Sequence, residues 1–208
     1  MNRNILISGV GGQGVITAGA LIAAAATNSG IKTVMSEIHG LSQRGGSVVV
    51  EVRMGDVFSP ITPAGKGDVL IGFEPIETLR NIHRCSPHCD VIMNTVRVYP
   101  VYLGIHRQKY PDDDSISSAL SGFRVLKIDP FSLFDFKNDS RPINSLILGA
   151  TCSWSNIGIP PDMIEHEIME RFSGRSMERN IEAFRAGYKY GRSVAEGDLY
   201  GIVQSRPQ

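Results

Sequence analysis

A glycine-rich stretch near the start of the chain has the composition of an anion-binding turn. Gly9, Gly11 and Gly14 fit the spacing G-x-G-x-x-G, and Gly12 and Gln13 occupy two positions between them. Glycines at this spacing let a ligand approach the backbone closely. If a helix begins directly after them, its first N–H groups lack helical partners and its dipole is positive there, so backbone alone could hold a phosphate or carboxylate. The same glycines could instead serve only a tight turn and close helix–strand packing.

One acidic residue lies where a dinucleotide-binding fold places the carboxylate that binds ribose. Glu37 directly follows residues 32–36, a segment typical of a strand, and lies about 20 residues after the glycine stretch. Together with the glycine spacing it leaves open, as an alternative, a stand-alone NAD(P)-binding module, either a small reductase or a redox regulator. The chain shows no evident Tyr–Lys pair that would complete such a reductase.

A second polar stretch follows that carboxylate and is rich in glycine. An arginine next to glycines could form a bidentate contact with a carboxylate or phosphate, or it could be a solvated side chain of an ordinary turn. We expect this stretch to bind substrate or to contact another subunit. Its candidate residues are His39, Gln43, Arg44, Gly45 and Gly46.

The elements that must position both stretches follow a β-α-β order. Residues 5–7 are typical of a buried strand, 15–26 of an Ala-rich helix and 32–36 of a second strand parallel to the first. The two stretches would then share one crevice at the carboxyl ends of adjacent strands. Further strands are expected at 47–53, 68–73, 90–95 and 123–128, and helices at 74–84, 116–120, 143–154, 161–172 and 177–195.

This order predicts a Rossmann-like, doubly wound α/β fold with a mostly parallel sheet, helices on both faces and a helical C-terminal part. With 208 residues and 42% hydrophobic content, the chain can fill one core and is short for two. We expect a single domain over residues 1–196 and a flexible tail over 197–208.

Charge and cysteine content exclude several classes of partner and environment. The 21 basic residues balance the 21 acidic ones, so no overall field attracts nucleic acid or an anionic membrane. The N-terminus has no secretory signal pattern, and the longest apolar segment, residues 18–26, is shorter than the roughly 20 residues of a membrane span. Three cysteines suit reduced thiols, which predicts a cytoplasmic protein.

One crowded cluster resembles a metal site only in its composition. His83, Cys85, His88 and Cys89 lie within seven residues. Structural zinc sites usually pair two separated knuckles, and four ligands this close would be strained in a tetrahedron. We therefore expect a loop with two reduced thiols and no metal.

Several of these motifs together resemble a known family. The pairing of GVGGQGVITAG (9–19) with SEIHGLSQRGGSVVVEVR (36–53), followed by Ser59-Pro60 and NIEAFRAG (180–187), resembles the gamma-type domain of 2-oxoacid:ferredoxin oxidoreductases. Within that family, EIHGLSQRGGSV is most similar to the beta subunits of indolepyruvate ferredoxin oxidoreductases. The resemblance spans nearly the whole chain.

The resemblance implies that this chain is the small subunit of a complex that oxidatively decarboxylates indolepyruvate or a related aryl-pyruvate to an acyl-CoA and reduces ferredoxin. Thiamine diphosphate and [4Fe-4S] clusters would belong to a larger alpha-type subunit, because three cysteines are too few for such a cluster. By analogy, the glycine stretch would lie near coenzyme A, and residues 43–46 would face the thiamine subunit. We expect this chain to bind no cofactor tightly and to be inactive alone; in isolation it could form a homodimer.

Overall fold

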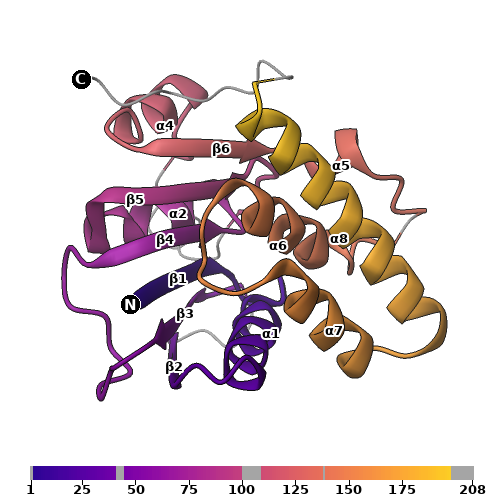
Figure 1. Ribbon diagram of the computed structural model, residues 1–208. Coiled ribbons are helices and arrows are strands. Elements are labelled where there is room, and N and C mark those ends of the chain that lie inside the picture. Colours follow the sequence, from indigo (N-terminus) through magenta and orange to yellow (C-terminus); the bar gives the residue numbers. More distant parts are fainter. Residues whose placement is uncertain (1, 41–44, 100–108, 138, 198–208) are drawn as a thin grey trace.

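Six strands form one sheet, and helices cover both of its faces (Figure 1). The computed structural model describes residues 2–40, 45–99, 109–137 and 139–197. The strands lie side by side in the order β2-β3-β1-β4-β5-β6. Their bounds are β1 Arg3–Val10, β2 Thr33–His39, β3 Ser47–Met54, β4 Gly67–Gly72, β5 Cys85–Asn94 and β6 Arg124–Ile128.

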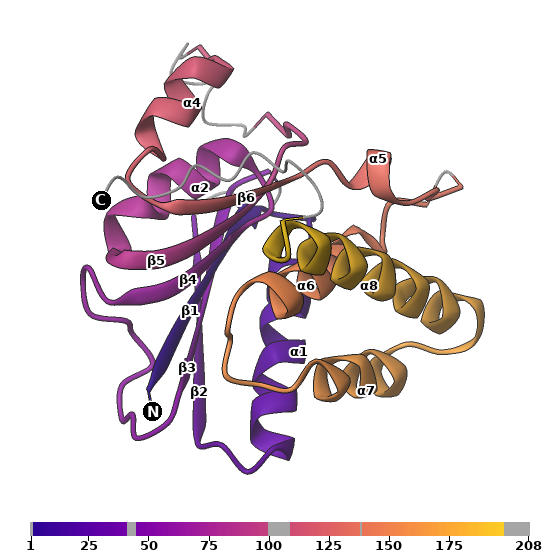
Figure 2. The ribbon, with the colours of Figure 1, turned by 45° about the horizontal axis from the view of Figure 1, so that its top comes forward.

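The helices divide between the two faces of the sheet. In Figure 2, α1, α6, α7 and α8 lie on one side, whereas α2 and α4 lie on the other. The predicted α/β class with a helical C-terminal part is confirmed. The helices are α1 Val15–Asn28, α2 Pro75–Asn81, the 3₁₀ turn η1 Ile82–Arg84, α4 Asp113–Ala119, α5 Pro130–Leu133, α6 Ile143–Trp154, α7 Pro161–Arg171 and α8 Gly174–Ala195.

One strand runs against the others, which corrects the expected neighbourhood of β1 and β2. β3 pairs antiparallel with both of them, so they run parallel to each other but are not adjacent. The pairs β1–β4, β4–β5 and β5–β6 are parallel. Residues 40–46, which join β2 to β3, are too few for the crossover that a parallel pair requires, so these strands form a hairpin.

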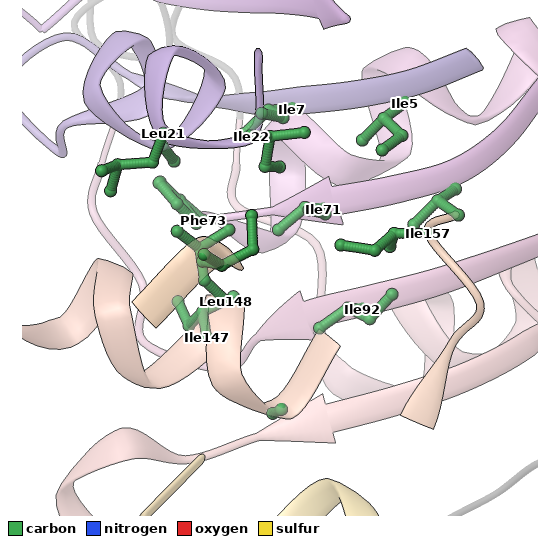
Figure 3. Packing of buried hydrophobic residues seen from close by; sticks show 14 of the residues in the cluster. Ile5, Ile7, Leu21, Ile22, Ile71, Phe73, Ile92, Ile147, Leu148 and Ile157 are labelled. Atoms are coloured by element: carbon green, nitrogen blue, oxygen red, sulfur yellow. The ribbon is translucent and has the colours of Figure 1, made fainter. Parts of the chain in front are cut away.

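Apolar side chains on both faces of the central strands form the core. In β1, Ile5, Leu6 and Ile7 have no exposed surface. Ile5 and Ile7 pack with Ile22 and other residues on the α1 side, shown in Figure 3, whereas Leu6 belongs to a second cluster that includes Ile116. A strand covered on both faces is apolar throughout, which explains the unbroken run that predicted it.

Glycines bring α6 and α8 into backbone contact. A Cβ added at Gly149 of α6 would lie 1.9 Å from the carbonyl oxygen of Phe184, and one added at Gly187 of α8 would lie 1.8 Å from that of Leu146. Only glycine fits at either position. This close crossing fixes α6 and α8 relative to each other.

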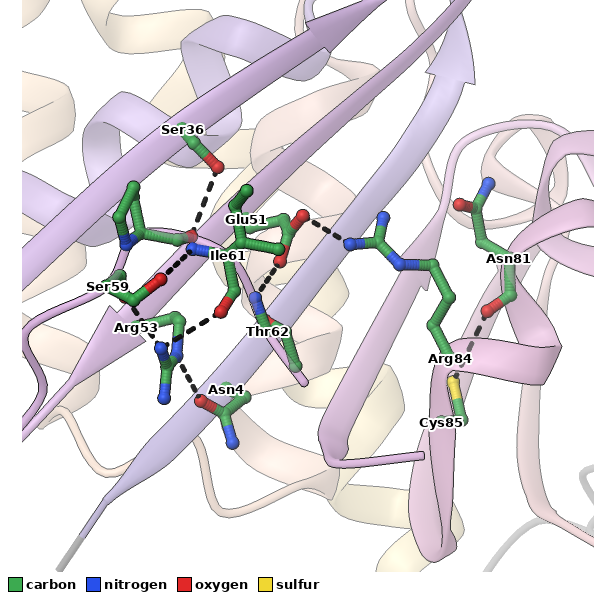
Figure 4. Close-up of polar contacts among 11 residues, drawn as sticks. Asn4, Ser36, Glu51, Arg53, Ser59, Ile61, Thr62, Asn81, Arg84 and Cys85 are labelled. Carbon is green, nitrogen blue, oxygen red and sulfur yellow. Dashed lines mark hydrogen bonds and ion pairs between the residues drawn. The ribbon is translucent and has the colours of Figure 1, made fainter. Parts of the chain in front are cut away.

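A polar network holds the segment after β3 against the face that carries α2 (Figure 4). Arg53 Nη1 donates to the carbonyl oxygens of Ser59 and Ile61, at 2.6 and 3.0 Å. The fully buried Glu51 forms an ion pair with Arg84 of η1. The Ser59-Pro60 motif therefore lies on a segment that charged groups of the sheet fix in place.

Most of the crowded His/Cys cluster forms the start of a strand, whereas His83 lies in η1. β5 begins at Cys85, five residues before the predicted start, so Cys85 and Cys89 are buried in the sheet and the expected loop was wrong. Among the described residues, no group of His, Cys, Asp or Glu could hold a metal ion. No helix within the described ranges is long and apolar enough to cross a membrane. Residues 198–208 of the expected tail lie outside the described residues.

Candidate functional site

The glycine stretch forms the turn between β1 and α1, as its spacing predicts. Gly12 and Gly14 have φ values of 100° and 75°, in the left-handed region that favours glycine, and Gly14 is the N-cap of α1. Gln13 closes the turn: its Oε1 accepts from the backbone N–H of Val10 at 2.7 Å, and its Nε2 donates to the carbonyl oxygen of Phe73 at 2.9 Å. Gln13 thus ties the turn to the end of β4.

The glycines of this turn have different roles. A Cβ at Gly9 would lie 2.8 Å from Val15 Cγ2, and one at Gly14 would lie 2.1 Å from Asn144 Nδ2, so both glycines permit close packing. A Cβ at Gly12 would meet nothing within 4 Å. Of these three glycines, Gly12 therefore has open space beside it.

That open space belongs to a pocket of about 460 Å³, which we name the glycine-turn pocket. It lies at the carboxyl ends of β1, β4 and β5. β1 and β4 are adjacent and parallel, but α1 and α2, which follow them, lie on opposite faces of the sheet (Figure 2). Such a switch point is where open α/β sheets bind ligands. The pocket is lined by Gly12, Gln13, Gly14, Thr17, Phe73, Asn94, Val96, Val98, Phe131, Ser140, Arg141, Ile143, Asn144 and Phe172.

Two helices begin at this pocket, and their N-termini make it electropositive. α1 starts after Gly14 and α6 starts at Ile143; among the described residues, neither helix has a side-chain N-cap bond or an acidic residue in its first turn. Their first N–H groups and dipoles favour an anion. Arg141 adds a charge at the same wall, where its guanidinium pairs with Asp139 at 2.7 Å.

Apolar groups make up much of the remaining lining. Val98 and Phe131 are two of the exposed large hydrophobic side chains of the chain, with 37% and 56% of their surface accessible. A ligand that carries both an apolar arm and an anionic group matches this combination.

The second polar stretch touches the glycine turn through its backbone. The N–H of Gly11 donates to the carbonyl oxygen of Gly46 at 2.8 Å, and Gly45 has a φ of 70°. The two stretches therefore meet, although β3 separates the strands that lead into them. Gln43 and Arg44 lie outside the described residues.

Glu37 lies away from the glycine turn. It is an exposed residue of the edge strand β2, and β3 lies between that strand and β1. Its Oε2 lies 3.1 Å from Nε2 of His39. In a dinucleotide-binding fold the corresponding acid stands on the strand adjacent to β1, so this sheet order differs from that fold.

Two buried acids beside the site were not predicted from the sequence. Glu74 follows β4 and caps α2, accepting from the N–H of Glu77 at 3.0 Å and from the hydroxyl of Tyr110. Glu77 accepts from Ser47 Oγ at 2.5 Å. Burial raises the pKa of both carboxyl groups above the ordinary value, against the lowering effect of these hydrogen bonds. An acid directly before Pro75 is an N-cap signal that could have located Glu74.

The sequence analysis also missed Arg141 and Asn144. Asn144 Nδ2 donates to the carbonyl oxygen of Gly14 at 3.3 Å, across 130 residues of sequence. A basic residue and an amide on either side of Pro142 at a helix start could have marked them as candidates.

Comparison with known proteins agrees with this architecture. The family model described as pyruvate ferredoxin/flavodoxin oxidoreductase matches residues 4–190. The indolepyruvate oxidoreductase subunit IorB of Archaeoglobus fulgidus is 34% identical over 190 residues, which cover 90% of this chain and 94% of that relative.

Two solved structures share the fold. The pyruvate oxidoreductase subunit PORC of Thermotoga maritima superposes with a TM-score of 0.69 at 21% identity, covering 90% of this chain and 96% of that one. The 2-oxoglutarate:ferredoxin oxidoreductase of Magnetococcus marinus, solved with 2-oxoglutarate, coenzyme A and succinyl-CoA bound, also has a TM-score of 0.69, at 18% identity. It covers 99% of this chain, which matches 32% of that longer one.

Proposed function

The chain belongs to the pyruvate ferredoxin/flavodoxin oxidoreductase family, and from that premise we propose that it is the small subunit of an indolepyruvate:ferredoxin oxidoreductase. The complex oxidatively decarboxylates indolepyruvate or a related aryl-pyruvate, transfers the acyl group to coenzyme A and reduces ferredoxin. The observation that carries this proposal is the similarity of nearly the whole chain to an indolepyruvate oxidoreductase subunit.

We assign the redox cofactors to a larger partner subunit. A [4Fe-4S] cluster takes four cysteine thiolates, and this chain has three cysteines. Two of them, Cys85 and Cys89, are buried in β5. The hydrogen bond with the Cys85 thiol, together with burial, raises the pKa of Cys89, which disfavours the thiolate that ligates iron. Thiamine diphosphate and the clusters would thus perform decarboxylation and electron transfer in the partner, and this subunit is inactive alone.

Coenzyme A is the ligand we propose for the glycine-turn pocket. Its phosphates suit the N-termini of α1 and α6 with Arg141, and its pantetheine arm suits the apolar wall formed by Val98 and Phe131. Gly12 leaves the backbone of the turn open to such a ligand, whereas Gln13 holds the turn in shape. Gly9, Gly11 and Gly14 would act through packing and turn geometry.

We assign residues 43–46 of the second stretch, together with His39, to the contact with the thiamine subunit. The bond from Gly11 to Gly46 would couple that interface to the coenzyme A pocket. Arg44→Ala should lower the activity of the assembled complex and leave the melting temperature of the chain unchanged. Unaltered viologen reduction by the variant complex would contradict this role.

The alternative of a stand-alone NAD(P) module has less support from the site. Because β3 separates Glu37 from the strand that carries the glycine turn, a ribose at Glu37 would not adjoin a pyrophosphate at Gly12 in the manner of that fold. Tight NAD binding by the purified chain that Glu37→Ala abolishes would favour the alternative.

We further propose a cytoplasmic location, in keeping with reduced thiols, and one domain over residues 1–196. An anaerobic pull-down of this chain from its own cells tests the function. We expect a larger companion that contains iron–sulfur clusters and thiamine diphosphate, and an eluate that reduces viologen with indolepyruvate and coenzyme A. A companion-free, inactive eluate would contradict the proposal.

A further inference from the structure

An exposed apolar strip runs along the edge strand β2, on the face of the sheet that carries α2. We name it the β2 patch and define it by Ile38, Phe58, Pro60 and Ile61. Phe58 is 83% exposed, the highest value among the large hydrophobic side chains of the described residues, and Ile61 and Ile38 are 60% and 45% exposed. Exposed apolar side chains that gather in one place mark an interaction surface, whereas scattered ones do not.

Hydrogen bonds and strand geometry place the members of the patch along β2. Ser36 Oγ donates to the carbonyl oxygen of Pro60 at 3.1 Å, which brings Pro60 over the middle of the strand. Ile38 is two residues beyond Ser36 and therefore points to the same face. At the other end, Lys32 Nζ lies 3.6 Å from the centre of the Phe58 ring, just before β2 begins. The patch thus follows β2 from its first residues toward its last.

The helices that the structure describes leave this face of β2 and β3 uncovered. α2 packs on β1, β4 and β5, whereas α1 packs on β2 and β3 from the opposite face (Figure 2). The segment after β3 lies over the uncovered face, but its own Phe58 and Ile61 remain exposed. This face is therefore available to another protein.

Polar bonds fix the backbone of the patch in one conformation. Arg53 Nη1 donates to the carbonyl oxygens of both Ser59 and Ile61 (Figure 4). The N–H of Thr62 donates to Oε2 of the buried Glu51 at 2.5 Å. A segment that is already ordered loses less conformational entropy when it docks, which favours association with a partner.

The charges beside the patch favour a protein partner over a lipid surface or a nucleic acid. Lys32 is paired with Asp56 at 4.0 Å, and Arg53 donates to backbone carbonyls of the patch segment. An anionic membrane or a nucleic acid would require unpaired cations around the apolar groups. The β2 patch therefore fits an uncharged, apolar protein surface.

We propose that the larger partner subunit docks on the β2 patch through an apolar surface, with Phe58 and Ile61 as the anchoring side chains. β2 ends at His39, so the patch leads into the stretch that we assign to the same subunit. In the longer Magnetococcus marinus chain this domain makes up 32% of one polypeptide, so a domain of this fold occurs in one chain with other parts of its enzyme. The inference rests on the proposed function and names the surface through which the complex assembles.

The experiment measures the affinity of this chain for the larger subunit. Biolayer interferometry on the immobilised larger subunit gives the Kd of wild type, Phe58→Ala, Ile61→Ala and the matched control Met169→Ala. Met169 is 44% exposed on α7, which lies on the opposite face of the sheet. Loss of an anchor predicts a rise in the Kd of about tenfold or more for each patch variant, and the control should bind as wild type does.

The melting temperatures of the patch variants should match that of wild type, because both side chains are exposed. An excess of either variant should restore the full turnover rate of the complex, since a docking residue does not touch the reacting groups. An unchanged Kd in both patch variants, or an equal rise in the control, would overturn the assignment. So would an isolated chain that sediments as a dimer and becomes a monomer on Phe58→Ala, because the patch would then join two copies of this chain.

The wild-type complex tests the proposed function separately. If it oxidises indolepyruvate with coenzyme A while the patch variants bind the larger subunit as tightly as wild type, only the docking surface is wrong. If wild type binds no larger subunit, the proposed function fails and the docking surface fails with it.

Discussion

The close crossing of α6 and α8 predicts that Gly187→Ala destabilises the protein although alanine is the better helix former. The new Cβ would lie 1.8 Å from the carbonyl oxygen of Leu146, whereas non-bonded atoms require about 3.5 Å. Backbone atoms cannot rotate away as a side chain can, so the helices must separate. Overpacking of this kind costs about 3 kcal/mol at the upper end of its usual range, and the gain in helix propensity offsets about 1 kcal/mol.

The net loss of about 2 kcal/mol corresponds to a fall in Tm of about 4–8 °C for a chain of this size. Differential scanning calorimetry of the purified chain measures it. The matched control is Gly122→Ala, because a Cβ there would meet nothing within 4 Å and the φ of Gly122 is outside the left-handed region. We expect a Tm equal to or slightly above wild type for that variant. A Gly187→Ala protein as stable as the control would refute the reasoning.

Three further variants test the site and its supports. Gln13→Ala removes the amide that bonds to the N–H of Val10 and to the carbonyl of Phe73, which should lower the free energy of unfolding by about 1–3 kcal/mol and raise the KM for coenzyme A. Chemical denaturation measures the first effect and steady-state kinetics the second. An unaltered KM would contradict the role of the turn. Glu51→Ala leaves the largely buried Arg84 unpaired, so the free energy of unfolding should fall by about 3–5 kcal/mol. The double variant Glu51→Leu/Arg84→Met, which removes both charges, should lose less stability. Equal losses in the two variants would show that the ion pair is not what holds the segment. Burial raises the pKa of Glu77, so its contribution to stability is present below the ordinary value of 4.5 and is lost as pH rises through the folded-state pKa. Glu77→Gln should therefore gain Tm relative to wild type as pH rises above 4.5, and a constant difference would exclude this linkage.

The order of elements could be predicted because it is encoded locally. Residues 5–7 and 68–73 are apolar runs of strand length, and the glycine turn lies where its spacing places it. The direction of β3 was missed because apolar alternation is the same in parallel and antiparallel strands, although the short connection from β2 indicates a hairpin. The early start of β5 was missed because Pro87 and His88 interrupt the apolar pattern in front of the predicted strand.

The candidate site was predictable only in part, for a related reason. Gly12 and Gln13 were found because a turn and a helix start are local features. Asn144 reaches the same turn from 130 residues away, and no sequence spacing encodes that contact. Glu77 has the sequence appearance of a solvated helix residue, and only tertiary packing against Ser47 shows that it is buried.

The most direct test of the central claim is reconstitution of the larger subunit with and without this chain, followed by the rate of viologen reduction with indolepyruvate and coenzyme A. We predict that viologen reduction requires both proteins and both substrates. We also predict that Gln13→Ala raises the coenzyme A concentration at which the rate is half-maximal. Equal, coenzyme A-dependent activity of the larger subunit alone would contradict the account.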